Sequence, residues 1–319
     1  TEEFQAMFSV RGKALYTKMD FLFKMIGEIL NSSKLEDTKR LYEIVASVKS
    51  RAQVNLTGAG HSTAVLRAAA YSSPMAAFQD EMAGIGYYQF IEKLEKDFEQ
   101  RKEETVEELC KLMKKILRPE NFMISYTGER ESLETVQKLA GTVKAGLGTE
   151  PVEKSKEKLT CTKKNEGFKT SGQVQYVAQT GNFKKKGLEY TGALEILKVI
   201  LSYDYLWMNL RVKGGAYGCM SSFLRTGDSY FVSYRDPNLA KTNAIYEKIP
   251  EYVASFDPDE RDMTKYIIGT FGALDTPLNP EAKGSRSMAA YLEHLTYEEI
   301  QKERDEILTA TPADIRSLS

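Results

Sequence analysis

The sequence contains few of the side chains that most often bind transition metals, with two histidines and three cysteines among 319 residues. His61 and His294 lie far apart in the chain. An inverted zinc-protease motif, H-x-x-E-H, places two imidazoles on one helical face, and no such spacing occurs here. We expect each histidine to have a structural or surface role. The sequence therefore predicts no metal site on this chain.

The cysteines give no sign of a disulfide framework. Cys110, Cys161 and Cys219 include no C-x-x-C pair, and their odd number is typical of reduced thiols in a cytosol-like compartment. The first residues, Thr1 to Glu3, show no signal-peptide pattern and look like the start of an excised piece. We therefore expect a cytoplasmic location, with an organelle matrix as the alternative.

Charge and hydropathy argue against two classes of partner. The net charge is -1, so no overall field attracts nucleic acid or an anionic membrane. Charged residues interrupt the long apolar stretches within about ten residues, which is too short for a membrane span. We expect no nucleic acid and no membrane as partners.

Two further kinds of catalytic motif are absent from the sequence. No G-x-S-x-G elbow marks a serine nucleophile, and no local signature surrounds a cysteine. The glycine-rich stretches 58–60 and 214–218 do not match G-x-x-x-x-G-K-[ST]. The second also leads into a predicted strand rather than a helix N-terminus, so a phosphate-binding loop is not expected.

A charged stretch divides the chain into two segments of similar size. Thr149 to Lys169 has almost no large apolar residue and contains Pro151 near its start, which is typical of a linker or a long surface excursion. We predict a first domain at residues 1–148, a linker at 149–169 and a second domain at 170–319.

Both predicted domains combine a few strands with many helices. Helical spacing of apolar residues predicts helices at 19–30, 36–54, 62–71, 76–94, 95–117, 132–145 and 193–206, and over most of 238–319. Strands are expected at 7–10, 121–127, 173–179, 216–225 and 229–235, the last two joined by a turn at Gly227-Asp228. In 173–179, alternation predicts a half-buried face of Val174, Tyr176 and Ala178.

This order of elements lacks the strict strand–helix alternation of a doubly wound parallel sheet. The predicted fold class is α+β, with two repeated domains, each an antiparallel sheet with helices packed on one face. A weak helix–proline repeat near 117 and 308 supports the duplication, and the chain looks truncated at both ends.

One segment combines hydrogen-bond donors with unusual backbone freedom, the RVKGGAYG stretch at 211–218. Its glycines, including Gly214 and Gly215, indicate a sharp bend or the close approach of another chain. Arg211 offers a fork of N–H donors and Tyr217 a phenolic donor, the kind of groups that stabilise an oxyanion. The alternative is a tight helix-to-strand turn with a surface arginine and a core tyrosine.

This segment resembles the C-terminal-half motif of the pitrilysin/insulinase family of zinc peptidases, particularly its presequence-protease branch. The SYRDPN stretch at 233–238 is similar as well, and the two together are fairly specific. Weaker similarities are spread over nearly the whole chain: residues 8–15, Gly60-His61 through Arg67 and Tyr71, and 84–90.

The resemblance implies a LuxS/metallohydrolase-like fold and a clamshell of two halves that encloses a peptide chamber. Zinc and its glutamate base would belong to the N-terminal half of the same polypeptide, so that half and peptide substrates are the expected partners. Carried over to this sequence, Arg211 and Tyr217 would contact the scissile carbonyl or the oxyanion. Gly214 and Gly215 would let the peptide backbone approach closely.

The resemblance leaves two functions open for the whole protein. One is a peptidase that hydrolyses unfolded peptides, with this chain inactive alone because it lacks H-x-x-E-H. The other is a catalytically silent peptide-binding or scaffold relative of the same fold. A helical interaction module unrelated to proteolysis would leave Arg211 and Tyr217 without a role.

Overall fold

The computed structural model of the chain describes residues 4–152, 159 and 161–319. Residues 4–148 are called the first half below, and residues 170–319 the second half. Within its described residues the first half contains seven α-helices. They are α1 (Met19–Ser32), α2 (Thr38–Gly58), α3 (Gly60–Ala69), α4 (Pro74–Ala83), α5 (Ile85–Lys96), α6 (Phe98–Ile116) and α7 (Leu133–Ala145).

The second half contains the strands and seven more α-helices. The strands are β1 (Ala178–Asn182), β2 (Gly218–Phe223) and β3 (Asp228–Tyr234). The helices are α8 (Ala193–Ile200), α9 (Ala240–Glu247), α10 (Ile249–Ala254), α11 (Glu260–Leu274), α12 (Pro280–Leu292), α13 (Tyr297–Leu308) and α14 (Pro312–Arg316). The α+β fold class is therefore confirmed.

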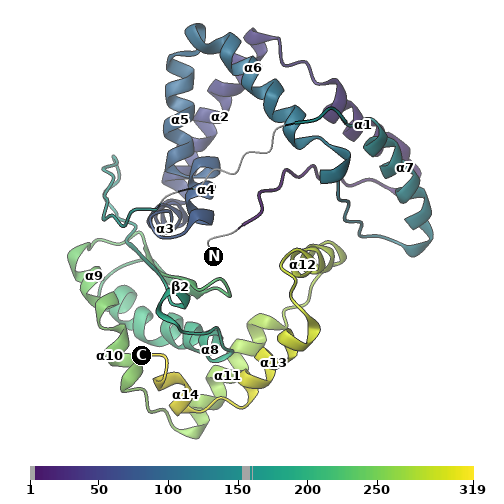
Figure 1. Ribbon diagram of the computed structural model, residues 1–319. Coiled ribbons are helices and arrows are strands. Elements are labelled where there is room, and N and C mark those ends of the chain that lie inside the picture. Colours follow the sequence, from purple (N-terminus) through teal and green to yellow (C-terminus); the bar gives the residue numbers. More distant parts are fainter. Residues whose placement is uncertain (1–3, 153–158, 160) are drawn as a thin grey trace.

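The helices of the first half lie together on one side of the molecule, and the sheet with α8–α14 lies on the other (Figure 1). The main apolar core belongs to the second half, where Ile196, Ile200 and Leu201 are fully buried. The first half has two smaller clusters, one between α1 and α7 and one shared by α2, α5 and α6. None of the helices in the described residues is both long enough and apolar enough to cross a membrane.

The sheet expected in the first half is not formed among the described residues. Neither 7–10 nor 121–127 pairs with another strand, and Phe122 and Tyr126 pack instead against the α1–α7 cluster. A strand exists only when another segment accepts and donates its ladder hydrogen bonds, which a periodicity within one segment cannot guarantee. The prediction of one sheet in each of two repeated domains is therefore not confirmed.

The sheet of the second half is antiparallel, with strand order β1-β3-β2. The predicted hairpin is confirmed, because β2 and β3 pair from Gly218↔Tyr234 to Phe223↔Ser229. Gly227 takes a φ of 90° in the connecting turn, a left-handed conformation that glycine adopts without a steric penalty.

β1 begins later than predicted, and the buried residue of the segment 173–179 is Val177, which directly precedes β1 and is not one of the three expected. Val177 is 5% exposed and belongs to the main core, whereas Val174 is exposed. Tyr176 lies on the opposite side, where its hydroxyl donates to Thr57 O of the first half at 3.4 Å. Because α3 also contacts β1 and β3, the sheet has helices on both sides, and a strand covered twice does not reveal its core face by alternation.

The two halves meet mainly where α3 lies against the sheet (Figure 1). Gly60 opens α3 directly beneath Tyr176, and a Cβ atom on Gly60 would come within 2.4 Å of that ring. Lys185 also crosses between the halves, because its ammonium donates to Ser72 O at 2.6 Å. Glycine at position 60 thus permits the close approach that joins the halves.

Two prolines mark helix starts in the second half. Pro280 and Pro312 occupy the first turn of α12 and α14, where the absent N–H would lack a partner in any case. Thr296 and Glu299 form a reciprocal capping box at the start of α13. These local signals explain why the helices of this region begin where the sequence indicates.

The expected linker contains neither helix nor strand at 151–152, 159 and 161–169. Its residues 153–158 and 160 lie outside the described residues. The domain boundaries proposed from the sequence remain predictions.

Candidate functional site

Arg211 and Tyr217 are brought together by a tight connection between a helix end and β2. After α8 the chain continues as two π-helical stretches, Leu201–Tyr205 and Trp207–Val212, and a π turn inside a helix often occurs at a functional site. The Arg211 guanidinium donates from Nη1 to the backbone carbonyl of Tyr217. The side chain of the arginine thus closes the turn that positions the tyrosine.

Each of the two glycines in this turn occupies a position that disfavours any larger residue. A Cβ atom on Gly214 would lie 2.5 Å from Leu210 O, so a larger residue would collide with the end of the helix. Gly215 takes a φ of 84°, which favours glycine. The turn then ends in Ala216, which is buried and whose N–H donates to Leu210 O at 2.9 Å.

The two donor side chains differ in how they are held. Arg211 stacks on Trp207, with its guanidinium carbon 4.4 Å from the ring centroid, within the range of a favourable cation–π contact. The Tyr217 side chain is 64% exposed, so the alternative of a core tyrosine does not hold. Arg211 is held at the Tyr217 backbone, and the exposed Tyr217 phenol can therefore meet a ligand without rearranging the core.

The SYRDPN stretch is hydrogen-bonded to this turn. Asp236 is 1% exposed and accepts from Thr242 Oγ1 at 2.6 Å and from the Asn238 backbone N–H at 2.8 Å. The Asn238 amide in turn donates to Gly214 O at 2.8 Å. The two stretches singled out in the sequence therefore form one hydrogen-bonded unit.

Cys219 lies on β2 only two residues beyond Tyr217, yet its chemistry is unsuited to attack on a substrate. Burial raises the pKa of its thiol to about 11, although the Arg211 charge opposes that shift. Because the thiolate is the reactive species, a thiol with this pKa is a poor nucleophile at neutral pH.

Both histidines contribute to packing or to a helix end. His61 packs edge-on against Tyr234 with ring centroids 5.0 Å apart, in the contact between α3 and the sheet. His294 follows α12 with a φ of 54°, and the N–H groups of His294 and Leu295 donate to Tyr291 O and Ala290 O. That pattern is a Schellman motif, in which glycine usually occupies the position of His294.

No three His, Cys, Asp or Glu side chains come together to hold a metal ion in the part of the chain that the structure describes. The zinc that the family resemblance implies would belong to the N-terminal half, and the described residues of this chain do not fit it.

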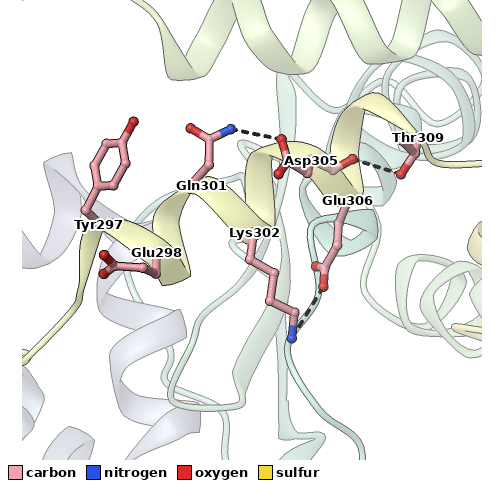
Figure 2. Close-up of a pocket in the computed structure, with 7 residues that line it drawn as sticks. All are labelled: Tyr297, Glu298, Gln301, Lys302, Asp305, Glu306 and Thr309. Carbon is pink, nitrogen blue, oxygen red and sulfur yellow. Dashed lines mark hydrogen bonds and ion pairs between the residues drawn. The ribbon is translucent and has the colours of Figure 1, made fainter.

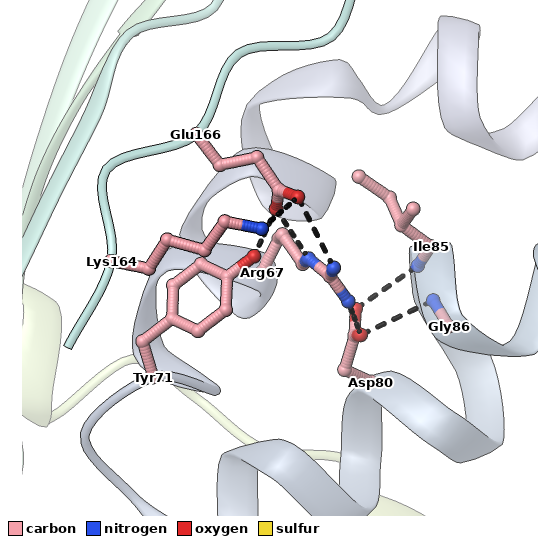
Figure 3. Close-up of polar contacts among 7 residues, drawn as sticks. All are labelled: Arg67, Tyr71, Asp80, Ile85, Gly86, Lys164 and Glu166. Atoms are coloured by element: carbon pink, nitrogen blue, oxygen red, sulfur yellow. Dashed lines mark hydrogen bonds and ion pairs between the residues drawn. The ribbon is translucent and has the colours of Figure 1, made fainter. Parts of the chain in front are cut away.

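A second polar cluster, which the sequence did not predict, joins the first half to the linker (Figure 3). Arg67 of α3 pairs with Asp80 of α4 at 2.6 Å and with Glu166 of the linker at 2.8 Å. Asp80 is 1% exposed and also accepts from the N–H groups of Ile85 and Gly86 at the start of α5.

The cluster gives a structural role to residues that the sequence marked only by their similarity to the family. Gly84 and Gly86 have no room for a Cβ atom beside the Asp80 carboxylate. The Tyr71 hydroxyl donates to Glu166, and Lys164 pairs with Glu166 at 3.1 Å. The only signal of the cluster in the sequence was the spacing of Arg67, Tyr71 and the two glycines, which does not identify the partners. These ion pairs and hydrogen bonds have a structural role, because they hold α3, α4, the start of α5 and the linker together.

The cluster predicts a specific acid sensitivity. Arg67 and, to a lesser extent, Tyr71 and Lys164 lower the pKa of Glu166 from 4.5 to about 2. Because the folded-state pKa is lowered, Glu166 stabilises the fold fully above pH 4.5, and this stabilisation is lost as the pH falls towards 2. We expect the melting-temperature difference between the native chain and Glu166→Gln to be positive at pH 6 and to shrink progressively below pH 4.5.

The control for this measurement is Glu36→Gln, at an exposed position outside the cluster. Its melting-temperature difference should stay close to zero throughout the titration. A Glu166→Gln difference that does not change between pH 6 and pH 2.5 would contradict the assignment of the low pKa.

A surface hollow along α13 is a poor candidate for a ligand-binding site (Figure 2). All of its lining residues come from one helix and its C-cap: Tyr297, Glu298, Gln301, Lys302, Asp305, Glu306 and Thr309. Figure 2 shows most of their polar groups paired along the helix, as in the Gln301–Asp305 hydrogen bond of 2.8 Å. A single helix face cannot surround a ligand, so the Arg211–Tyr217 turn remains the candidate functional site.

Comparison with known proteins identifies the chain. A model of the PreP C-terminal domain matches residues 165–318, and a model of a peptidase-associated domain matches residues 1–94. The chain belongs to the pitrilysin/insulinase family of peptidases. Within that family it corresponds to a large part of the C-terminal half of a presequence-protease-like member.

Two relatives show the extent of the similarity. Protein HypA of Clostridium perfringens (strain 13 / Type A) is 38% identical over 99% of this chain and 32% of its own length. Presequence protease 1, chloroplastic/mitochondrial, of Arabidopsis thaliana is 31% identical over 97% of this chain and 29% of its own length. The chain thus spans about a third of the length of the curated relatives it matches.

A solved structure of a protease from Helicobacter pylori is a weaker match. It shares 15% identity, with a TM-score of 0.41 over 58% of this chain and 49% of that chain. A likeness of this size carries no conclusion about the site.

Proposed function

We propose that this chain is the substrate-contacting half of a zinc-dependent peptidase that hydrolyses unfolded peptides inside a closed chamber. The observation that carries the proposal is the turn in which Tyr217 has an exposed phenol and Arg211 donates to the Tyr217 backbone carbonyl while stacking on Trp207. The names of the relatives support peptide hydrolysis as the reaction of the whole protein.

In this proposal Tyr217 and Arg211 act on the oxygen of the scissile carbonyl. When that carbon becomes tetrahedral, its oxygen gains negative charge and needs hydrogen-bond donors. The Tyr217 hydroxyl donates to this oxyanion, and a free N–H of Arg211 donates to the same oxygen or to the neighbouring substrate carbonyl. Because Arg211 is held before substrate arrives, little reorganisation is needed when the charge develops.

Gly214 and Gly215 have no side chains that would cover the backbone of this turn. The peptide backbone can therefore approach the turn closely, which is the substrate-binding role proposed for these two residues. The turn lies at the start of β2, so a substrate there is aligned by a rigid strand rather than by a flexible loop.

The proposal assigns zinc and the general base to the N-terminal half of the same polypeptide, which is the expected partner of this chain. No cofactor is proposed for this chain itself, and neither nucleic acid nor a membrane is proposed as a partner. The cytoplasm remains the proposed compartment, with an organelle matrix as the alternative that the organelle names of several relatives favour.

The proposed function is tested by comparing this chain with the full-length protein. We expect the full-length protein to cleave an unstructured peptide of about 20 residues and to lose that activity after dialysis against a zinc chelator. This chain alone should neither cleave the peptide nor retain stoichiometric zinc by elemental analysis.

Two outcomes would overturn parts of this proposal. One equivalent of zinc on this chain alone would contradict the location of the metal. A full-length protein that binds the peptide without cleaving it would instead favour a catalytically silent peptide-binding or scaffold relative.

A further inference from the structure

The side chain of Arg235 contacts the ring of Tyr217 at one end of the β2–β3 hairpin. The last register pair of β2 and β3 is Gly218↔Tyr234, and the Tyr217 N–H donates to Tyr234 O at 2.9 Å. Tyr217 precedes β2 and Arg235 follows β3, so the two residues flank that pair at the same end of the hairpin. The guanidinium carbon of Arg235 lies 5.9 Å from the centroid of the Tyr217 ring, within cation–π range.

The same guanidinium also contacts a second aromatic ring. It lies 5.4 Å from the centroid of Tyr234, whose ring in turn packs against His61 and Tyr176. His61 belongs to α3 of the first half, so the arginine rests on a surface to which both halves of the chain contribute. Arg235 has no ion-pair partner among the described residues, and its charge is directed to these rings.

The backbone at this position is held in an unfavourable conformation. Arg235 has a φ of 48°, a left-handed value shared among non-glycine described residues only by His294. The next residue is firmly anchored, because Asp236 and Gln175 exchange two backbone hydrogen bonds of 2.8 Å. Glycine would relieve the strain, so an arginine kept there in this structure points to a use for its side chain.

We infer that Arg235 is a positioning residue, which holds the exposed phenol of Tyr217 in the direction required for donation to the oxyanion. The inference deepens the proposed function and rests on it. An exposed tyrosine ring otherwise samples several rotamers, and only some of them aim the hydroxyl at a substrate. A cation over the ring face favours one of these rotamers. The hydroxyl then points at the oxyanion in a larger fraction of the enzyme molecules, and kcat is higher.

The test uses the full-length protein and the substitution Arg235→Gly, which removes the guanidinium and also relieves the backbone. We expect kcat to fall about 2- to 5-fold, the range that an exposed cation–π contact supports, with KM changed less than twofold. The melting temperature should stay the same or rise. Arg235→Lys, which keeps a cation over the ring, should recover part of the lost kcat.

The matched control is His294→Gly. It relieves the other left-handed non-glycine residue, at the end of α12 and in a different element from the turn, so kcat should not change while the melting temperature again stays the same or rises. A fall of both kcat and melting temperature in Arg235→Gly would assign Arg235 to the fold and overturn the inference.

A double variant tests whether Arg235 acts through Tyr217. In a Tyr217→Phe background the hydroxyl is already absent, so adding Arg235→Gly should lower kcat no further. An equal further loss would show that Arg235 acts on the substrate independently, which overturns the positioning role. If Tyr217→Phe alone leaves kcat unchanged, the proposed function itself fails; if only Arg235→Gly has no effect, the inference alone fails.

Discussion

Tyr217→Phe in the full-length protein is expected to lower kcat by about 100- to 1000-fold, the cost of removing one oxyanion donor. The change deletes only the hydroxyl and keeps the ring that faces Arg235. The Tyr217 side chain is largely exposed, so its hydroxyl contributes little to the fold. KM should change little, because the lost hydrogen bond is strongest when the carbonyl oxygen carries negative charge.

The measurement is steady-state hydrolysis of an internally quenched, unstructured peptide. Tyr203→Phe is the matched control, since Tyr203 is 75% exposed in the π-helical stretch Leu201–Tyr205 of the same connection but is not assigned a contact with substrate. It should retain the kcat of the native protein. An unchanged kcat in Tyr217→Phe would remove the tyrosine from the mechanism.

Arg67→Met is expected to lower the free energy of unfolding by about 3–5 kcal/mol, the usual cost of breaking a buried ion pair. The reason lies in Asp80, whose side chain is 2% exposed and would keep only the N–H groups of Ile85 and Gly86 as partners. Glu166 would lose its arginine as well, so the linker segment would be held less firmly against α3.

Urea unfolding of this chain measures the effect. Arg101→Met is the control, because Arg101 pairs with Glu104 along one exposed helix face, where ion pairs contribute less than about 1 kcal/mol. The double change Arg67→Met with Asp80→Asn should be less harmful than the sum of the single changes, since the unpaired charge is gone. A loss in Arg67→Met no larger than in Arg101→Met would show that the start of α5 alone satisfies Asp80.

Several features could be predicted from the sequence because they depend on neighbours in the chain. The β2–β3 hairpin was predicted from the turn at Gly227-Asp228, and Gly227 has the positive φ that this turn requires. The RVKGGAYG turn was also recognisable, since only glycine fits Gly214 beside the helix end and Gly215 at positive φ. Each is a local steric requirement that the residue type reveals.

The sequence by itself therefore determined the α+β class, the hairpin and the pairing of an arginine with a tyrosine at one turn. Only the tertiary structure decided that Val177 rather than Tyr176 joins the main core, that Arg67 fastens Asp80 to Glu166, and that Arg235 faces Tyr217. The reason is physical. These contacts join residues from different elements, and which surfaces cover one another is set by packing between elements rather than by the periodicity of any one of them.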